Sequence, residues 1–286
     1  MRSIREVLAQ DGSALQNTLS LTAQDARSEA QSLLQHALGV NRAWLLAHPE
    51  QVPDAERQAA YAKLLQRRLG GEPIAYILGE REFFGLTFKV TPATLIPRPE
   101  TELLVELALA HLPPQGRVLD LGTGSGAIAL SIAHARADSQ VMAVDASAEA
   151  LEIARQNGER LGVGNLCFKH SDWFAALAAE RFDLIVSNPP YIAANDEHLA
   201  RGDLRFEPRA ALASGADGLD GIRRIIAGAG AHLDTAGWLL LEHGYDQADA
   251  VRTLLLTNGF TKVFSANDLS GIERVSGGMA LAGTQI

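Results

Sequence analysis

Hydrophobic residues recur at helical spacing over the first quarter of the chain, with few signs of strands. Three stretches within residues 1–69 place apolar side chains three and four positions apart, which predicts amphipathic helices. They are Ser3–Gln10, Ala23–Leu38 and Asp54–Leu69. Breaks follow from Asp11-Gly12, Gly39 and Pro49, and Asp54 is a suitable N-cap for the third helix. The pattern predicts a small helical bundle.

A glycine-rich break separates this region from a short extended one. Gly70-Gly71-Glu72-Pro73 interrupts the helical pattern, and apolar clusters follow within Ile74–Pro97. The clusters predict extended segments that form a β-hairpin: Tyr76-Ile77-Leu78, Phe83-Phe84 and Thr87–Val90. We therefore expect a helical domain over residues 1–72, a linker with a hairpin over 73–100, and a second domain over 101–286.

From about Thr101 the pattern changes to alternating helices and short apolar strands. The predicted helices are Thr101–His111, Ala127–Ala135, Ala148–Leu161, Gly221–Leu233 and Gln247–Asn258, and alanine-rich Ala175–Ala179 also favours a helix. The predicted strands are Val118–Leu121, Val141–Val144, Leu166–Lys169, Leu184–Ser187 and Trp238–Glu242, followed by a terminal hairpin. Such alternation is typical of an α/β domain with a mostly parallel sheet covered on both faces.

Composition sets limits on this organisation without changing it. A length of 286 residues suits one large domain or two unequal ones, and 47% hydrophobic residues suffice for a substantial core. No apolar run approaches the roughly 18 residues that a membrane span requires, and Met1–Gln10 lacks the apolar centre of a secretory signal. We therefore expect a cytoplasmic protein with no membrane partner.

The single cysteine and the net charge narrow the chemistry. Cys167 excludes an intramolecular disulfide, fits a reducing cytosol, and lies in an apolar run that predicts a buried structural thiol. The eight histidines are scattered without metal-ligand spacing, so no metal is expected. A net charge of −9 weighs against a protein that coats nucleic acid, because binding to phosphates needs clustered Lys and Arg.

A glycine-rich loop joins the first strand of the second domain to the helix that follows. Alternate glycines allow a tight turn and the close approach of a ligand, and the helix start offers unpaired N–H groups. The spacing is Gly-x-Gly-x-Gly, whereas the dinucleotide fingerprint requires Gly-x-Gly-x-x-Gly. The carboxylate of Asp120 favours the positive groups of S-adenosylmethionine over a pyrophosphate. The candidate cofactor-binding residues here are Gly122, Thr123, Gly124, Ser125 and Gly126.

The ends of the next two strands carry further cofactor candidates. Asp145 ends the second strand, where an acidic side chain can accept both ribose hydroxyls; Ser147 is the better candidate for capping the following helix. Asp172-Trp173 follows the third strand. Trp173 is placed to pack on an adenine base and Asp172 to accept from its amino group, although a partly buried surface aromatic would look the same.

Asn188-Pro189-Pro190-Tyr191 stands at the carboxyl end of the fourth strand, the edge where open α/β sheets bind ligands. Two prolines cannot continue a central strand, so the chain must turn there. A conjugated amide or amine nitrogen is a poor nucleophile, and hydrogen bonds to the Asn188 oxygen and the Pro189 carbonyl would orient it. Tyr191 can stack on the flat group and aim it at the methyl carbon. The motif predicts methylation of a planar nitrogen.

Further motifs carry a resemblance to a known family. They are Tyr76–Phe83, Thr94–Glu102, Leu119–Gly126, Asn188–Tyr191, Phe206-Glu207-Pro208 and Leu241-Glu242-His243-Gly244. With these, the chain resembles over nearly its whole length the HemK/PrmC family of protein-(glutamine-N5) methyltransferases. The segment Ile96–Thr101 is the most specific, because general methyltransferases do not carry it.

The resemblance implies a seven-stranded, Rossmann-like class I methyltransferase sheet, a small N-terminal helical domain for substrate recognition, and a linking hairpin. It implies that the acceptor is the glutamine of a Gly-Gly-Gln loop in peptide chain release factors. The cofactor would be S-adenosylmethionine, lined by Gly122–Gly126, Asp145, Trp173 and Asn188. Asn188, Pro189 and Tyr191 would be catalytic, and Asn188, Pro189, Pro190 and Tyr191 would form the glutamine pocket.

Several alternatives stay open at this point. An adenine-N6 methyltransferase of DNA or RNA would use the same acceptor logic, but the acidic balance disfavours it. A non-catalytic binding protein and a nicotinamide-dependent oxidoreductase are disfavoured by the intact acceptor motif and the glycine spacing. Pro97–Glu100 fits a rigid connector or a segment that closes over the cofactor. The charges from Arg201 to Arg209 fit a solvated face or a contact with the release factor.

Overall fold

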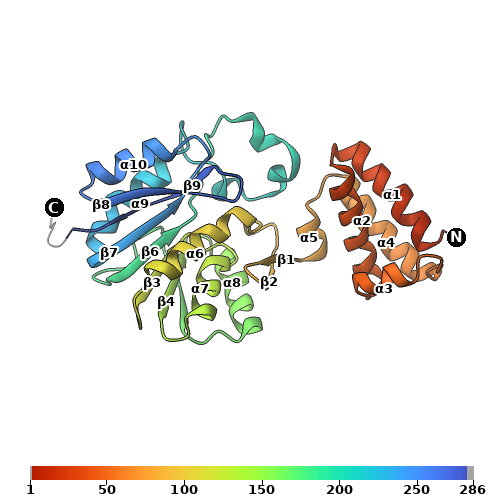
Figure 1. Cartoon of the computed structure of the whole chain (residues 1–286), viewed down its shortest axis with the longest axis horizontal. Helices are drawn as coiled ribbons and strands as arrows, with labels where there is room; N and C mark the ends of the chain where they lie inside the picture. The colour runs from red at the N-terminus through yellow and green to blue at the C-terminus, as the bar shows by residue number, and fades with distance from the viewer. Residues whose placement is uncertain (1, 282–286) are drawn as a thin grey trace. The chain divides into compact units, whose positions relative to one another are not determined.

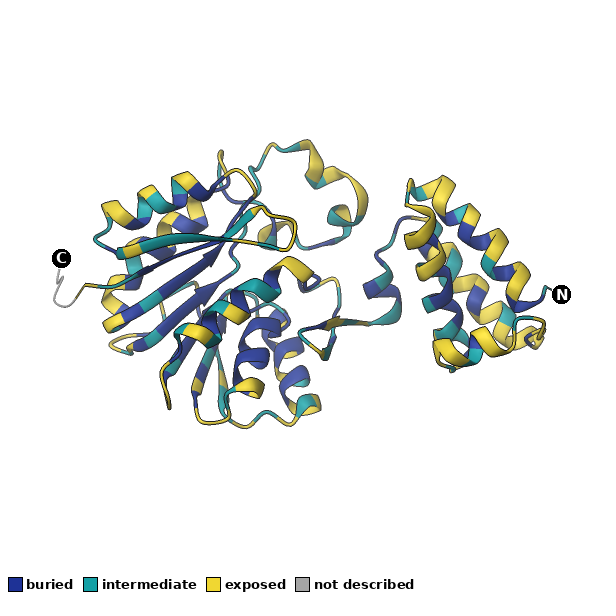
Figure 2. Cartoon of the chain, viewed as in Figure 1, coloured by how far each residue is buried: buried dark blue, intermediate teal, exposed yellow. Residues whose placement is uncertain are grey.

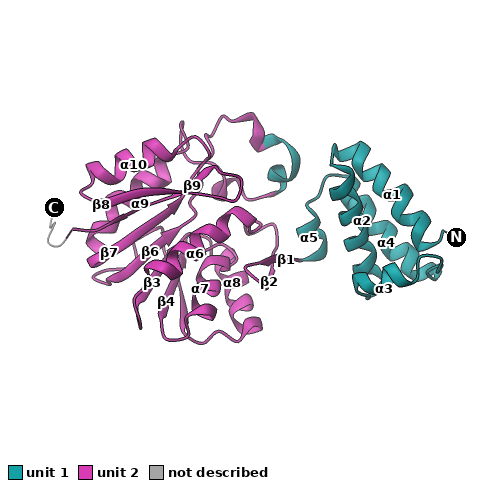
Figure 3. Ribbon diagram, in the orientation of Figure 1, with its two compact units in different colours: residues 1–79, 200–206 teal, residues 80–199, 207–286 magenta. Residues whose placement is uncertain are grey.

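In this computed structural model, residues 2–281 are described, and the chain divides into two compact units (Figure 3). Unit 1 comprises Met1–Gly79 and Ala200–Phe206, and unit 2 comprises Glu80–Leu199 and Glu207–Ile286. The predicted domain limits near residues 72 and 100 stay predictions. Ala200–Phe206, a segment of seven residues far along the chain, packs with the first unit, which sequence order alone does not reveal.

Unit 1 is a bundle of short helices around a leucine-rich core (Figure 1). Its helices are α1 (Ile4–Leu19), α2 (Ala23–Leu38), α3 (Arg42–Ala47), α4 (Ala55–Leu69) and α5 (Ile74–Leu78). The predicted apolar stripe of α2 is buried, with Leu33 and Leu34 in contact with the other helices. Asp54 accepts a hydrogen bond from the Arg57 N–H, which confirms it as the N-cap of α4.

Two expectations for unit 1 were wrong. Helix α1 does not break at Asp11-Gly12: Arg2 pairs with the buried Asp11 at 2.6 Å, and Gly12 lies against α2 near Arg27. The segment around Tyr76-Ile77-Leu78 is the short helix α5 and not a strand. Its apolar run is buried on several sides, and Gly79 ends it in the left-handed conformation with φ of 77°. A short buried run does not distinguish a strand from a helical turn.

The predicted hairpin is present at the start of unit 2. Strands β1 (Glu80–Phe83) and β2 (Leu86–Lys89) pair antiparallel across Phe84-Gly85. Phe83 and Phe88 are buried and their rings meet edge to face, so the hairpin is fixed to the core of its own unit.

The rest of unit 2 is a seven-stranded sheet with helices on both faces (Figure 1). The strands are β3 (Arg117–Leu121), β4 (Gln140–Asp145), β5 (Leu166–His170), β6 (Phe182–Ser187), β7 (Leu233–Glu242), β8 (Thr261–Asn267) and β9 (Glu273–Met279). Their order is β5-β4-β3-β6-β7-β9-β8, and β9 runs antiparallel to the other six strands. The predicted α/β class, the parallel sheet and the terminal hairpin are confirmed.

The central strands of the sheet are largely buried (Figure 2). Alternation along these strands divides the core into two layers. Val118 and Val186 face α6 (Glu102–His111) and α7 (Ala127–Ala135), while Leu119 and Ile185 face α9 (Asp220–His232) and α10 (Ala248–Thr257). Because strands buried on both faces need apolar residues at every position, they read as continuous hydrophobic runs. The remaining long helix, α8 (Ala148–Leu161), packs beside β5, and Ser147 caps it by accepting from the Ala150 N–H.

Short 3₁₀ turns punctuate the segments that enter and follow the candidate site. They are Pro99–Thr101, which leads into α6, and Glu197–Ala200, Gly202–Phe206 and Arg209–Ala211 after the acceptor motif. Two expectations in unit 2 were wrong. Ala175–Ala179 forms successive turns, because Trp173 and Ala178 take positive φ values of 50° and 33° that a helix does not allow. Cys167 is exposed, because β5 is an edge strand of the sheet.

Candidate active site

Three neighbouring strands end at one edge of the sheet and bring the predicted residues together. Leu121 at the end of β3 is level with Val144 of β4 and with Ser187 of β6. The residues that follow these positions are Gly122, Asp145 and Asn188. The cofactor loop and the acceptor motif therefore meet at the point where the sheet order turns, which is where open α/β sheets bind ligands.

The glycine loop has the backbone that its sequence requires. Gly122, Gly124 and Gly126 have φ values of 72°, 58° and 83°, all in the left-handed region. A Cβ at Gly126 would lie 2.8 Å from Cδ1 of Leu130, so a side chain there meets both backbone strain and a close neighbour. The N–H groups of Gly122 and Thr123 donate to the Val144 carbonyl, which holds the loop against β4.

Asp120 supports the loop from below and is not on the cavity wall. Its Oδ2 accepts a hydrogen bond of 2.6 Å from the Thr123 hydroxyl, and its Oδ1 has no partner among the described residues. Burial raises the pKa of Asp120 to about 7, with the Thr123 hydrogen bond acting in the opposite direction. Because Asp120 does not line the cavity, the glycine loop lies between its carboxylate and a cofactor. The expected attraction to the positive groups of the cofactor would therefore act across this loop.

Asp145 connects the loop to α8. Its two oxygens accept from the Gly124 N–H and the Ser147 N–H, each at 2.8 Å. A carboxylate oxygen has a second lone pair, so both oxygens can still accept from the two hydroxyls of a ribose. The two backbone bonds hold the carboxylate in place at the cavity wall.

Trp173 packs against the glycine loop at Gly122. Its ring lies 3.5 Å from the place where a Cβ on Gly122 would be, and its own φ of 50° is unusual for a bulky residue. Such a backbone conformation persists only where surrounding contacts hold it, and it is common in ligand sites. The neighbouring Asp172 is exposed and pairs with Arg224 at 2.9 Å, so its carboxylate already has a partner.

A cavity of 540 Å³ opens between these elements. Its wall includes the predicted cofactor residues Gly122, Thr123, Gly124, Ser125, Asp145, Trp173 and Asn188, together with Pro189 and Pro190. Gly126 and Tyr191 are not part of the wall; Gly126 begins α7 and Tyr191 packs into the core beside α9. The volume and the mixture of apolar and polar lining are typical of a site for a small organic cofactor.

The acceptor motif is held rigidly around Asn188. The Asn188 amide nitrogen donates to Oγ1 of the buried Thr101 at 3.2 Å, and no described residue donates to its Oδ1. After the two prolines, Ile192 pairs with the segment around Ala213, which fixes the turn. Gln247 completes the arrangement by donating to the Tyr191 carbonyl at 3.0 Å.

Tyr191 lies differently from the simple expectation of a stacking ring. Its hydroxyl donates to Oε1 of Glu242 at 3.4 Å, and burial raises its pKa well above the ordinary value. Glu242 is 1% exposed and its Oε2 lacks a partner of full hydrogen-bond geometry among the described residues. Sequence reasoning assigned no role to Thr101, Glu242 or Gln247, although Glu242 stands at the carboxyl end of a strand.

The segment Pro97–Glu100 is tied down by a buried acid. Glu207 has a fully buried side chain that pairs with Arg98 and accepts from the Ile96 N–H at 3.0 Å. Pro97 and Arg98 line the cavity. Glu207 is therefore not part of a solvated face, and the segment is anchored and forms part of the cavity wall; that it closes over a cofactor stays a prediction.

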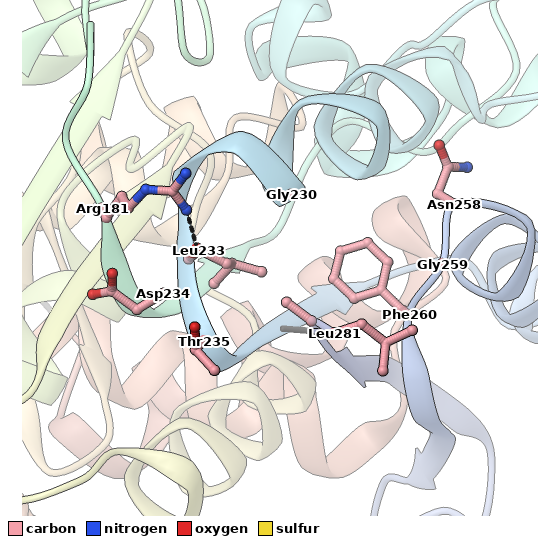
Figure 4. A pocket seen from close by; sticks show the side chains of 10 residues that line it. Arg181, Gly230, Leu233, Asp234, Thr235, Asn258, Gly259, Phe260 and Leu281 are labelled. Atoms are coloured by element: carbon pink, nitrogen blue, oxygen red, sulfur yellow. Dashed lines mark hydrogen bonds between the residues drawn. The ribbon is translucent and has the colours of Figure 1, made fainter. Parts of the chain in front are cut away.

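A smaller pocket in the described part of unit 2 contains none of the predicted site residues. A pocket of 90 Å³ lies where β6 and β7 begin, lined by Arg181, Leu233, Asp234, Phe260 and others (Figure 4). Arg181 there donates to the Leu233 carbonyl at 2.6 Å. Within residues 2–281, no cluster of three or more His, Cys, Asp or Glu side chains could bind a metal ion, and none of the helices has the length and apolar character to span a bilayer.

Comparison with known proteins identifies the family. The model of the PrmC N-terminal domain matches residues 14–79, and that of the Methyltransferase small domain matches residues 99–206. A release factor glutamine methyltransferase of Bordetella pertussis is 54% identical over 255 residues, which cover 88% of this chain and 94% of that protein. The chain belongs to the release factor glutamine methyltransferase family. A second member, from Burkholderia pseudomallei, is 55% identical over 87% of this chain and 90% of its own length.

Solved structures agree on the fold. A 16S rRNA N2 G1207 methyltransferase of T. Thermophilus, determined in complex with AdoMet and guanosine, matches with a TM-score of 0.54 and 22% identity. The match covers 70% of this chain and 49% of that one. The chain therefore has the class I methyltransferase fold. As a member of this family, it is an S-adenosylmethionine-dependent methyltransferase.

Proposed function

We propose that this enzyme transfers the methyl group of S-adenosylmethionine to the N5 amide nitrogen of the glutamine in the Gly-Gly-Gln motif of peptide chain release factors, supporting translation termination. One observation carries the proposal. The glycine loop after β3 and Asn188 after β6 open on the same 540 Å³ cavity, in a chain whose relatives of the family are about half identical to it. A methyl donor and a planar nitrogen would meet there.

The residues around the cavity fit the cofactor in chemistry. Asp145 would accept from the ribose hydroxyls, the N–H groups of the glycine loop would hold the polar end, and Trp173 would pack against the adenine. Gly126 would contribute by starting α7 in a left-handed conformation and not by direct contact. The bound cofactor supplies a methyl group on a positive sulfur, which is ready to be transferred without further activation.

The acceptor residues would bind and orient the glutamine amide. Asn188 Oδ1 and the Pro189 carbonyl would accept from its two N–H groups, which turns the nitrogen toward the methyl carbon. Pro190 and Tyr191 would shape the pocket, with Tyr191 held by Glu242 and by Gln247. Because an N-methylated amide cation loses its proton readily, alignment of the two reactants is the main contribution required of the protein.

We also propose a cytoplasmic enzyme whose partner is the release factor, with no membrane contact and no direct binding of nucleic acid. The net charge of −9 supports this, since a nucleic-acid surface needs clustered cations. An adenine-N6 methyltransferase would use a similar acceptor motif on a base, so the nature of the acceptor is the point to test.

The test is methyl transfer from radiolabelled S-adenosylmethionine to purified release factor. We expect label in the wild-type release factor and none when the glutamine of its Gly-Gly-Gln motif is replaced by alanine. DNA and RNA of matched concentration serve as alternative acceptors. Equal labelling of the altered release factor, or label in nucleic acid alone, would contradict the proposed substrate.

A further inference from the structure

A buried acid outside the predicted site stands next to the acceptor asparagine. Leu241 of β7 is level with Ser187 of β6, so Glu242 and Asn188 are the next residues of two adjacent parallel strands. Glu242 is 1% exposed, so its carboxyl group is shielded from solvent. An ionisable group in such a position is costly unless it has a function or good partners.

Two hydroxyl groups connect this acid to the acceptor motif. Tyr191 donates to Glu242 Oε1 at 3.4 Å, and the hydroxyl of Thr101, 4% exposed, interacts with the same carboxyl group. Thr101 Oγ1 also accepts from the Asn188 amide nitrogen at 3.2 Å. The network therefore joins the start of α6, the end of β6 and the end of β7.

The direction of the hydrogen bonds in this network depends on the charge of Glu242. An ionised carboxylate only accepts, so a Thr101 hydroxyl that turns toward Glu242 gives its proton to the carboxylate and can then only accept from Asn188. The Asn188 nitrogen then faces Thr101 and its oxygen faces the cavity. A protonated Glu242 can donate to Thr101, which frees the threonine proton for the Asn188 oxygen and removes the preference for that amide orientation.

We propose that Glu242 is a positioning residue whose ionisation, passed through Thr101, fixes the Asn188 amide with its oxygen toward the substrate nitrogen. Tyr191 is held by the same carboxylate, so one buried charge orders both ends of the acceptor motif. The significance for catalysis rests on the proposed function, whereas the orientation of Asn188 is a property of the enzyme alone.

The surroundings of Glu242 place the pKa of its carboxyl group near neutral pH. Burial raises the pKa of Glu242 to about 7; the Thr101 hydroxyl and Arg274 of β9 act to lower it, and Glu100 beside the start of α6 acts to raise it. Tyr191 has a pKa well above this range because it is buried, and burial lowers the pKa of His243 below its ordinary value. The ionisation of Tyr191 or of His243 would therefore not produce a change near neutral pH. Asp120 has a similar pKa but belongs to the network of Thr123 under the glycine loop.

The test observes Asn188 directly in the full-length enzyme. With ¹⁵N-asparagine labelling, the side-chain amide signal that disappears in Asn188→Ala belongs to Asn188. We expect this signal to shift with pH with a midpoint near 7 in the wild type, and the step to vanish in Glu242→Gln. Asp120→Asn and Ser276→Ala are matched controls that should keep the step, since Ser276 contacts His243 and not the network. Thr101→Val removes the hydroxyl that links Glu242 to Asn188, so it should also abolish the pH-dependent step of the Asn188 signal.

A kinetic arm uses labelled methyl transfer to the release factor. The kcat should rise through the same pH range in the wild type, and Glu242→Gln should give a flat profile with kcat lowered roughly 10- to 100-fold and little change in cofactor affinity. An Asn188 signal without a step, or a step that survives both Glu242→Gln and Thr101→Val, overturns the inference. A wild-type enzyme that shows the step but does not label release factor would instead refute the proposed function and leave the inference supported.

Discussion

At the residue scale, the site separates a cofactor role from an acceptor role. Asp145 accepts from two backbone N–H groups, which hold the loop, and it lines the cavity. Asn188 donates to Thr101, and its Oδ1 accepts no hydrogen bond from a described residue. The two side chains lie at the carboxyl ends of β4 and β6, which are separated by β3, and they share no hydrogen bond with each other among the described residues. Their substitutions should therefore affect different steps.

Asn188→Ala should lower kcat roughly 100-fold or more while the dissociation constant of S-adenosylmethionine changes little, because the amide orients the acceptor. Asp145→Ala should weaken cofactor binding by roughly 10- to 100-fold, since it removes the ribose acceptor and releases the Gly124 N–H. Calorimetric binding and labelled-transfer kinetics on both variants separate the effects. A kcat that is unchanged in Asn188→Ala would refute the role given to the acceptor motif.

The residues that sequence reasoning identified lie within local motifs. Gly122, Asp145 and Asn188 each follow a predictable strand, and parallel strands bring their carboxyl ends to one edge. The partners that it missed are distant in sequence: Thr101 is separated from Asn188 by 87 positions, and Tyr191 from Glu242 by 51. No periodicity encodes such pairs, because they arise only when the sheet order is known.

At the element scale, long periodic segments were predicted well and short ones were not. Helices α7 and α8 agree with prediction, because the apolar stripe of α8 continues for several turns and α7 is buried on all sides from Ala127 to Ala133. The short helix α5 was read as extended, since five apolar residues fit either structure. The turns over Ala175–Ala179 follow from backbone conformations that alanine propensity does not reveal.

Asn157 of α8 connects three elements and gives a prediction at this scale. Its side chain is fully buried, accepts from the Lys89 N–H, and donates to the carbonyls of Lys89 and Ser125. It thereby joins the hairpin strand β2 to the glycine loop. Asn157→Ala should lower the free energy of unfolding by roughly 2–4 kcal/mol, because three buried backbone groups lose their partner.

Urea denaturation followed by tryptophan fluorescence measures this change, with bound S-adenosylmethionine as a second condition. Asn195→Ala is the matched control, because Asn195 is exposed in a turn. Stability equal in the two variants would show that the three hydrogen bonds are replaced by water at little cost. A loss confined to the cofactor-bound condition would place the effect in the loop alone.

At the scale of the whole molecule, sequence order and spatial grouping differ at one place. The alternation of elements predicted an α/β region that continues without interruption from residue 101, yet Ala200–Phe206 belongs to unit 1. The reason lies in specific polar contacts. Arg68 of α4 is 3% exposed, pairs with Glu29 of α2 at 2.7 Å, and reaches Asp203 at 3.1 Å, while Arg205 donates to the Gly70 carbonyl. The charge alternation in the sequence predicted none of these pairings.

Removal of the Arg68 side chain should therefore release Ala200–Phe206 from unit 1. In Arg68→Met, a buried guanidinium that serves two acids is lost, and local opening of the segment should cost less free energy. We expect chymotrypsin to cleave at Leu204 or Phe206 roughly tenfold faster or more, because about 1.4 kcal/mol corresponds to a factor of ten in the open population. Arg67→Met is the matched control: Arg67 pairs with Glu72 near the surface and does not contact the segment. Equal cleavage of both variants, with sites mapped by mass spectrometry, would mean that contacts other than Arg68 hold Ala200–Phe206 in unit 1.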